Sequence, residues 1–239
     1  MKFSLPICST AVSTLIFISA TSEGAVVSTI DTFDAATSDV DLSGNNGFKT
    51  ESSSGLGIVG GTRNNSLTVT SNPLLQTARS RLNYSDSGVL SISLGTQVAG
   101  FVELDYDNGG TGIGGFDLTV AGMADSLGWK ILFLDLPTRL GAVVTDTSGA
   151  SANSSFDLVS SISSATEVTM PFTGFTLTEG SSFDWTNVDT IKFQVEPTTA
   201  AMDVVIDDFY AASTIPEPGV GILCTLAAGA LAFVRRRPE

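Results

Sequence analysis

Short runs of β-branched and aromatic residues recur along the middle of the chain, separated by clusters of Gly, Asn, Asp and Ser. This pattern predicts strands with no helices between them. The expected strands span residues 66–70, 88–94, 98–106, 116–121, 130–136, 140–145, 166–172, 188–196 and 202–210. In 188–196, three apolar residues alternate with Lys192, Gln194 and Glu196, so one face is expected to be buried and the other wet.

Nine closely spaced strands predict an all-β fold, a single β-sandwich or jelly roll. No linker is rich enough in Pro or Gly to split the region into two domains, and no internal repeat is evident. We therefore expect one domain, residues 26–215, which is long enough to enclose a sizeable core.

The first 25 residues depart from the strand pattern. A single basic residue, Lys2, precedes a largely apolar run from about Leu5 to Ala20. This is the form of a secretory signal peptide, and the run is short for a stable membrane span. Residues 1–25 are thus predicted to be a signal peptide cleaved after Ala25. Cleavage at the small residues 20–22 and a permanent N-terminal anchor are the alternatives.

The last 24 residues combine three features in a fixed order. Pro216-Glu217-Pro218 holds the backbone extended, as a protease substrate requires. An uncharged stretch at 219–234 suits a short hydrophobic helix, and Arg235-Arg236-Arg237 would stay on the cytoplasmic side of a membrane. Residues 216–239 are therefore predicted to be a sorting and anchor segment, with a plain C-terminal membrane anchor as the alternative.

This order of motif, hydrophobic helix and arginines resembles the PEP-CTERM sorting signal. The resemblance implies processing by an exosortase, a membrane-embedded transpeptidase-like protease that cuts near the motif and discards the tail. It further implies a Gram-negative bacterium that makes exopolysaccharide. The precursor would be held transiently in the inner membrane, and the mature protein would reach the cell surface or extracellular matrix.

The middle of the chain is strongly acidic. Three of the 25 acidic and four of the 11 basic residues lie in the two ends, which leaves 22 against 7 and a net charge of −15 for residues 26–215. Such a domain repels phosphate backbones, so nucleic acid is not expected as a partner. The chain has no histidine, and its two cysteines, Cys8 and Cys224, lie in the end segments. An enzyme is not expected, because the usual general base and the common nucleophile systems are missing.

Parts of the middle also resemble known sequences. Residues 29–34 and 60–63 resemble the start of a domain that recurs in PEP-CTERM proteins. Residues 185–189 and 204–209 are similar to the final strands of galactose-binding-like jelly rolls, which include many carbohydrate-binding modules. This resemblance supports a fold more than a function.

The jelly-roll resemblance implies a structural calcium ion. Asp207 on the last strand would meet Asp31 and Asp34 near the first strand, and calcium takes six to eight such oxygen ligands. In a regular strand Asp207 and Asp208 would point to opposite faces. The alternative is that Asp207 accepts hydrogen bonds from a nearby loop and that Asp208 is solvated.

Trp185 is the candidate sugar-binding residue, because it lies in a loop-like stretch and an aromatic ring can stack on a sugar. Core packing is its alternative role and the expected role of Trp129. The expected function is a secreted, non-catalytic β-sandwich with a structural or adhesive role, and the alternative is a carbohydrate-binding module for exopolysaccharide. A shallow groove lined by exposed aromatic residues would favour that module, whereas a deep acidic cleft with two facing carboxylates would favour a glycosidase or lyase.

Overall fold

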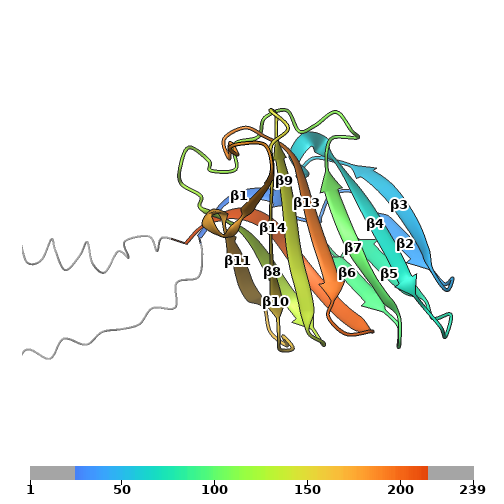
Figure 1. Ribbon diagram of the computed structural model, residues 1–239. Helices are drawn as coiled ribbons and strands as arrows, with labels where there is room; N and C mark the ends of the chain where they lie inside the picture. Colours follow the sequence, from blue (N-terminus) through green and yellow to red (C-terminus); the bar gives the residue numbers. More distant parts are fainter. Residues whose placement is uncertain (1–24, 215–239) are drawn as a thin grey trace, which may run out of the picture.

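The computed structural model describes residues 25–214, whose strands form two antiparallel sheets that lie face to face (Figure 1). The first sheet has the order β11-β8-β14-β6-β5-β2, with β1 also paired to β14. Its strands are β1 (Ala25–Asp31), β2 (Ser38–Leu42), β5 (Ala78–Leu82), β6 (Leu90–Leu94), β8 (Ser126–Leu134), β11 (Thr166–Pro171) and β14 (Met202–Ser213). The predicted all-β sandwich is confirmed.

The second sheet has the order β12-β10-β9-β13-β7-β4-β3. Its strands are β3 (Gly47–Ser54), β4 (Thr62–Ser71), β7 (Ala99–Tyr106), β9 (Thr138–Asp146), β10 (Ser151–Leu158), β12 (Thr176–Glu179) and β13 (Val188–Pro197). Two 3-10 turns lie in connections: η1 (Val59–Gly61) joins β3 to β4 within the second sheet, and η2 (Phe172–Gly174) lies between β11 of the first sheet and β12 of the second. Strand β13 shows the predicted alternation, with Lys192, Gln194 and Glu196 on the face away from the core.

An apolar core fills the space between the sheets, because the inward residues of facing strands interdigitate there. At its centre Trp129 of the first sheet stacks on Phe209, with 5.3 Å between ring centroids. Phe193 of the second sheet lies 5.1 Å from the Trp129 ring and 5.5 Å from the Phe209 ring. All three side chains are fully buried, so the core role expected for Trp129 is confirmed.

Residues 116–121 do not form the expected strand. The Asp117 carboxylate accepts hydrogen bonds from the backbone N–H groups of Thr119 at 2.9 Å and Ala121 at 2.8 Å. Val120 and Ala121 accordingly have φ angles of 49° and 58°. The aspartate closes a local turn, and these short-range hydrogen bonds outweigh the strand propensity of the sequence.

The two ends of the described chain lie side by side, because Ala25 of β1 pairs with Ser213 of β14. Within the described residues, the buried core extends from Ile30 to Ala211. The predicted signal peptide, apart from Ala25, and the sorting residues Pro216, Glu217, Pro218, Arg235, Arg236 and Arg237 fall outside the described residues and stay predictions. Within residues 25–214, no helix has the length and apolar character needed to span a membrane.

Candidate functional site

The outward face of the second sheet carries polar side chains from four neighbouring strands, β10, β9, β13 and β7. Strand pairing arranges the outward residues of these strands in three rows. The first row is Asn153, Val143, Lys192 and Asp105; the second is Ser155, Gly141, Gln194 and Glu103; the third is Asp157, Arg139 and Glu196. Each row crosses the strands at intervals of about 4.8 Å, the spacing between paired strands.

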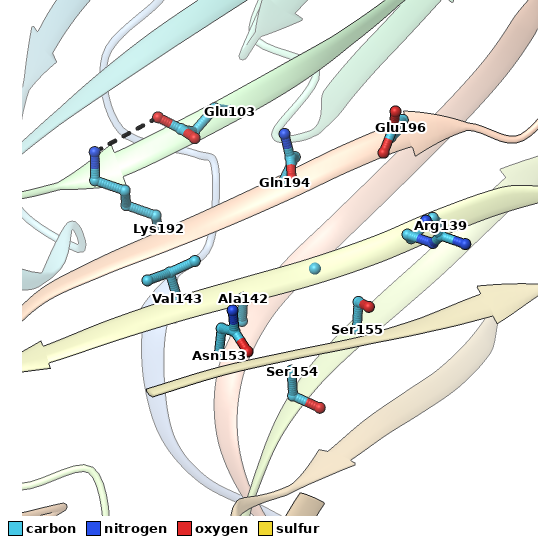
Figure 2. A pocket seen from close by; sticks show the side chains of 11 residues that line it. Glu103, Arg139, Ala142, Val143, Asn153, Ser154, Ser155, Lys192, Gln194 and Glu196 are labelled. Atoms are coloured by element: carbon cyan, nitrogen blue, oxygen red, sulfur yellow. Dashed lines mark ion pairs between the residues drawn. The ribbon is translucent and has the colours of Figure 1, made fainter. Parts of the chain in front are cut away.

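A hollow of about 260 Å³ lies at the centre of this face (Figure 2). Its floor is Gly141, the one residue of the middle row without a side chain. A Cβ atom built there would meet nothing closer than 3.8 Å, at the Gln194 side chain. The hollow therefore exists because Gly141 has no side chain, and the residues around Gly141 on all three rows form its walls.

The cations beside the hollow are already paired with carboxylates. Arg139 Nε lies 2.8 Å from Asp157 Oδ1, and this hydrogen bond raises the pKa of Arg139. Lys192 Nζ lies 3.0 Å from Asp105 and 3.7 Å from Glu103. Desolvation lowers the pKa of Lys192, but the hydrogen bond and charge of Asp105, with the charge of Glu103, raise it above its ordinary value. Both side chains thus stay positive while their charge is neutralised locally.

The uncharged groups of the hollow can both donate and accept hydrogen bonds. Gln194 and Asn153 offer amides, and Ser155 offers a hydroxyl. These are the groups that match a ligand rich in hydroxyls, since each hydroxyl also donates and accepts. None of the described residues that line this hollow is aromatic. Sequence alone placed Lys192, Gln194 and Glu196 on one face, and the glycine in strand 140–145 was the one further signal of a special position.

Trp185 lies away from this hollow, in an aromatic cluster next to η2. Its ring stacks on Phe172 at a centroid distance of 4.2 Å and meets the edges of Phe175 at 5.0 Å and Phe183 at 4.7 Å. All four rings are partly buried and pack against the core. Three phenylalanines thus surround Trp185, as expected for its alternative role in packing. Sugar binding by Trp185 stays a prediction.

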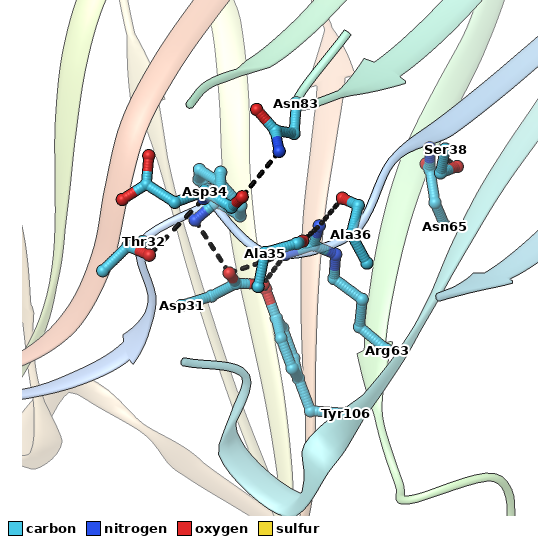
Figure 3. A network of polar contacts seen from close by, with 11 residues as sticks. Asp31, Thr32, Asp34, Ala35, Ala36, Ser38, Arg63, Asn65, Asn83 and Tyr106 are labelled. Atoms are coloured by element: carbon cyan, nitrogen blue, oxygen red, sulfur yellow. Dashed lines mark hydrogen bonds and ion pairs between the residues drawn. The ribbon is translucent and has the colours of Figure 1, made fainter. Parts of the chain in front are cut away.

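Asp31 lies inside the sandwich, fully buried (Figure 3). Its carboxylate accepts hydrogen bonds from Arg63 Nη1 at 2.6 Å, the Tyr106 hydroxyl at 3.0 Å and the Phe33 N–H at 2.8 Å. Burial raises the pKa of Asp31, and the Arg63 charge opposes that rise. The segments 29–34 and 60–63, noted in the sequence analysis for their resemblance, are therefore joined by an internal ion pair that sequence reasoning did not identify.

Asp207 and Asp208 lie on the same face of β14, contrary to the expectation for a regular strand. Ile206 pairs with Ile131 and Asp208 with Lys130, so Asp207 is the extra residue of a β-bulge. Lys130 Nζ lies 2.5 Å from Asp207 and 3.9 Å from Asp208. A lysine therefore serves as the cation between these carboxylates.

Asp31, Asp34 and Asp207 do not form one group of metal ligands. Asp31 faces Arg63 in the interior, Asp34 is exposed, and Asp207 contacts Lys130. In the described part of the chain, no three His, Cys, Asp or Glu side chains are placed to hold a metal ion together. Calcium binding stays a prediction.

No family model and no curated protein matches this chain. Among solved structures, it is similar to a family 11 carbohydrate-binding module of a cellulosomal cellulase from Clostridium thermocellum, with 14% identity and a TM-score of 0.39 over 79% of this chain and 96% of that module. A family 30 module of another cellulase from the same organism has 17% identity and a TM-score of 0.37, over 74% and 98%. An exo-β-agarase has 14% identity and a TM-score of 0.40, over 82% of this chain and 26% of the agarase chain. Likeness at this level identifies neither a ligand nor an activity for this chain.

Proposed function

We propose that residues 25–214 form a non-catalytic carbohydrate-binding domain that holds a neutral polysaccharide on the open face of the second sheet. The observation that carries the proposal is the hollow over Gly141, framed by hydrogen-bonding side chains from four strands. Of the two roles expected from the sequence, this choice favours the binding module over a purely structural sandwich.

The geometry suits an extended chain of sugars. Polar groups recur across the face at the strand spacing of about 4.8 Å, close to the length of one sugar residue in an extended chain. Gln194, Asn153 and Ser155 can each exchange hydrogen bonds with hydroxyl groups.

The charge of the domain favours a neutral ligand over an acidic one. Arg139 and Lys192, the two cations of the hollow, already contact Asp157, Asp105 and Glu103. The domain as a whole carries an excess of acidic residues that repels polyanions. A uronic acid or sulfate group would therefore have to displace a carboxylate from its partner before it gained a cation.

Two features support a binding role over hydrolysis. The hollow lies on the outward face of one sheet, whereas glycoside hydrolysis needs two carboxyl groups on either side of the scissile bond. Its carboxylates, Glu103 of β7 and Glu196 of β13, project from the same face of the sheet in neighbouring rows, and Glu103 is engaged by Lys192. Export, exosortase processing and location at the cell surface or in the matrix complete the proposal, and they rest on the sequence of the two end segments.

The test is binding of purified residues 25–214 to a soluble neutral glucan, a neutral galactan and a polyuronate, measured by affinity electrophoresis and calorimetry. We expect binding to a neutral polymer that Gln194→Ala and Asn153→Ala weaken. Thr68→Ala is the matched control, because Thr68 lies on the second sheet outside the hollow.

Failure to bind either neutral polymer would contradict the proposed function. Binding that survives both hollow variants unchanged would contradict the site. Release of reducing sugar that Glu103→Gln or Glu196→Gln abolishes would contradict the non-catalytic assignment.

A further inference from the structure

We infer that a second hollow, at the seam where the edge strands β2 and β3 of the two sheets meet, is a separate glycan-binding site. This seam hollow has a volume of about 420 Å³ and is lined by Thr37, Ser38, Asp39, Glu51, Tyr84 and Ser85. Glu51 of β3 closes the seam beneath it, because its Oε2 accepts a hydrogen bond from the Asp39 N–H of β2 at 2.9 Å. No residue of the seam hollow belongs to the hollow over Gly141.

Tyr84 gives the seam hollow an aromatic surface, which the other hollow lacks. The Tyr84 residue is 48% exposed. The Arg81 guanidinium covers one face of its ring at 4.2 Å from the centroid. Arg81 is itself fixed by Asp39, with 2.9 Å between Nε and Oδ1. The ring is thus held from one side while its exposed part borders the hollow.

The buried network of Asp31 and Arg63 fixes the first of the two loops that wall this hollow (Figure 3). Arg63 Nη2 donates hydrogen bonds to the carbonyl groups of Ala35 at 2.7 Å and Ala36 at 3.0 Å. These carbonyls belong to the loop that leads into Thr37. A second buried residue, Asn65, donates to the Ser38 hydroxyl at 2.9 Å. The first wall is therefore anchored in the interior of the sandwich.

The second wall is the loop after β5, and Asn83 anchors it. The Asn83 side chain is buried, donates to the Asp34 carbonyl at 2.5 Å and accepts from the Gly88 N–H at 2.9 Å. Asp34 lies in the first loop, so this one amide ties the two walls to each other (Figure 3). Tyr84 and Ser85 follow Asn83 directly and are carried by this anchor.

Backbone strain is concentrated in these two loops. Five non-glycine residues there have positive φ: Phe33, Ala36, Asn83, Ser85 and Asp86. Such conformations are unfavourable for residues with a side chain and persist only where surrounding contacts enforce them. The buried ion pair holds the first loop through the Ala35 and Ala36 carbonyls. Asn83 holds the loop that carries Tyr84.

The lining selects a sugar residue as the ligand. A pyranose ring presents C–H groups on its face and hydroxyls at its rim, which match the Tyr84 ring and the surrounding hydroxyls and carboxylates. Asp39 and Glu51 accept hydrogen bonds from sugar hydroxyls and repel acidic groups. We therefore assign the seam hollow to one residue of a neutral glycan. Because the two hollows share no residue, one domain can hold two chains at once and link them.

The test maps both hollows in a single titration. Isotopically labelled residues 25–214 are titrated with cellotetraose and with a galactan tetrasaccharide while the backbone amide resonances are followed by NMR. We expect saturable shifts at residues 37–39 and 83–86. Tyr84→Ala should weaken binding there by about tenfold or more, as truncation of a central aromatic residue does, and Tyr84→Phe should keep the ring and most of the affinity. Phe48→Ala is the matched control, since Phe48 is 66% exposed on β3 and does not line the hollow.

The outcomes separate this inference from the proposed function. Shifts confined to residues 139–143 and 192–196 that Tyr84→Ala leaves unchanged would overturn the seam site and keep the site over Gly141. Shifts at 83–86 that only Tyr84→Ala removes, with no shift at Gly141, would support the seam site and overturn the other. Absence of shifts at 37–39 and 83–86 with both tetrasaccharides would overturn the seam site in every case.

Discussion

Replacing Gly141, the floor of the hollow, with a larger residue tests the proposed binding site directly, because the backbone at Gly141 tolerates a side chain. Gly141 does not have the positive φ that makes other glycines of this chain irreplaceable, and a Cβ there finds 3.8 Å of clearance. Gly141→Leu should therefore fold. A strand glycine costs roughly 0.5–1 kcal/mol relative to a residue with a side chain. At roughly 2–4 °C per kcal/mol, the melting temperature should stay level or rise by about 1–4 °C.

The same substitution should remove binding. A leucine side chain at position 141 occupies the space in front of Gln194, Asn153 and Ser155. Loss of three hydrogen bonds at about 1 kcal/mol each amounts to about 3 kcal/mol, or roughly 100-fold in Kd. Calorimetry of wild type, Gly141→Ala and Gly141→Leu against the bound polysaccharide measures this, with thermal melts alongside. Wild-type affinity in a folded Gly141→Leu domain would refute the site, and an unfolded variant would refute the reasoning about clearance.

Three further predictions concern stability and processing. The Asp146 carboxylate accepts hydrogen bonds from the Ser148 hydroxyl and from three backbone N–H groups, and the Ser148 hydroxyl is the largest cause of its lowered pKa. This stabilisation is present above about pH 4 and is lost as the pH falls through the lowered pKa. In denaturant titrations, Asp146→Ala should therefore lower the free energy of unfolding at pH 7 by about 2–3 kcal/mol, and the variant should lose less stability than wild type on acidification. Lys130→Gln leaves Asp207 and Asp208 without their cation, so it should lower the free energy of unfolding by about 0.5–1 kcal/mol and increase the rise in melting temperature that calcium produces. Thermal melts of wild type in calcium and in chelator test the predicted calcium site, and identical melting temperatures would contradict it. Mass spectrometry of mature protein from the native host should show no residues beyond the Pro216-Glu217-Pro218 region, and an intact tail through Arg237 would contradict exosortase processing.

Sequence periodicity predicts best the strands whose inward face is entirely apolar. Strand β13 is one, and its outward residues Lys192, Gln194 and Glu196 were assigned correctly. Strand β5 was missed because one of its inward residues is Ser80, which interrupts the apolar alternation. The Ser80 hydroxyl is fully buried and donates to Asn65 Oδ1 at 2.8 Å. A buried, hydrogen-bonded polar pair thus interrupts the alternation of apolar and polar residues from which strands are predicted.

The candidate sites depend on pairings that no local pattern contains. Gly141 becomes the floor of a hollow only because β10 and β13 flank β9 in a register that places Ser155 and Gln194 on either side. A shift of one residue in either pairing would put inward side chains around it instead. The seam hollow likewise requires β2 and β3 to lie at matching edges of different sheets. Such long-range registers are set by the whole fold, so sequence reasoning placed its candidates on the residues with the most conspicuous chemistry, such as Trp185 and Asp207.

The excess of carboxylates is the basis of the predicted calcium site, which stays a prediction. Two of the carboxylates concerned contact basic side chains of the protein itself: Asp31 contacts Arg63, and Asp207 contacts Lys130. Six of the seven basic residues within 25–214 have a carboxylate oxygen within 4 Å. The few cations are therefore committed to local pairs, in the core, at the β14 bulge and beside both hollows. A domain with this distribution has little positive charge left for a polyanion, which is the physical basis for proposing a neutral ligand.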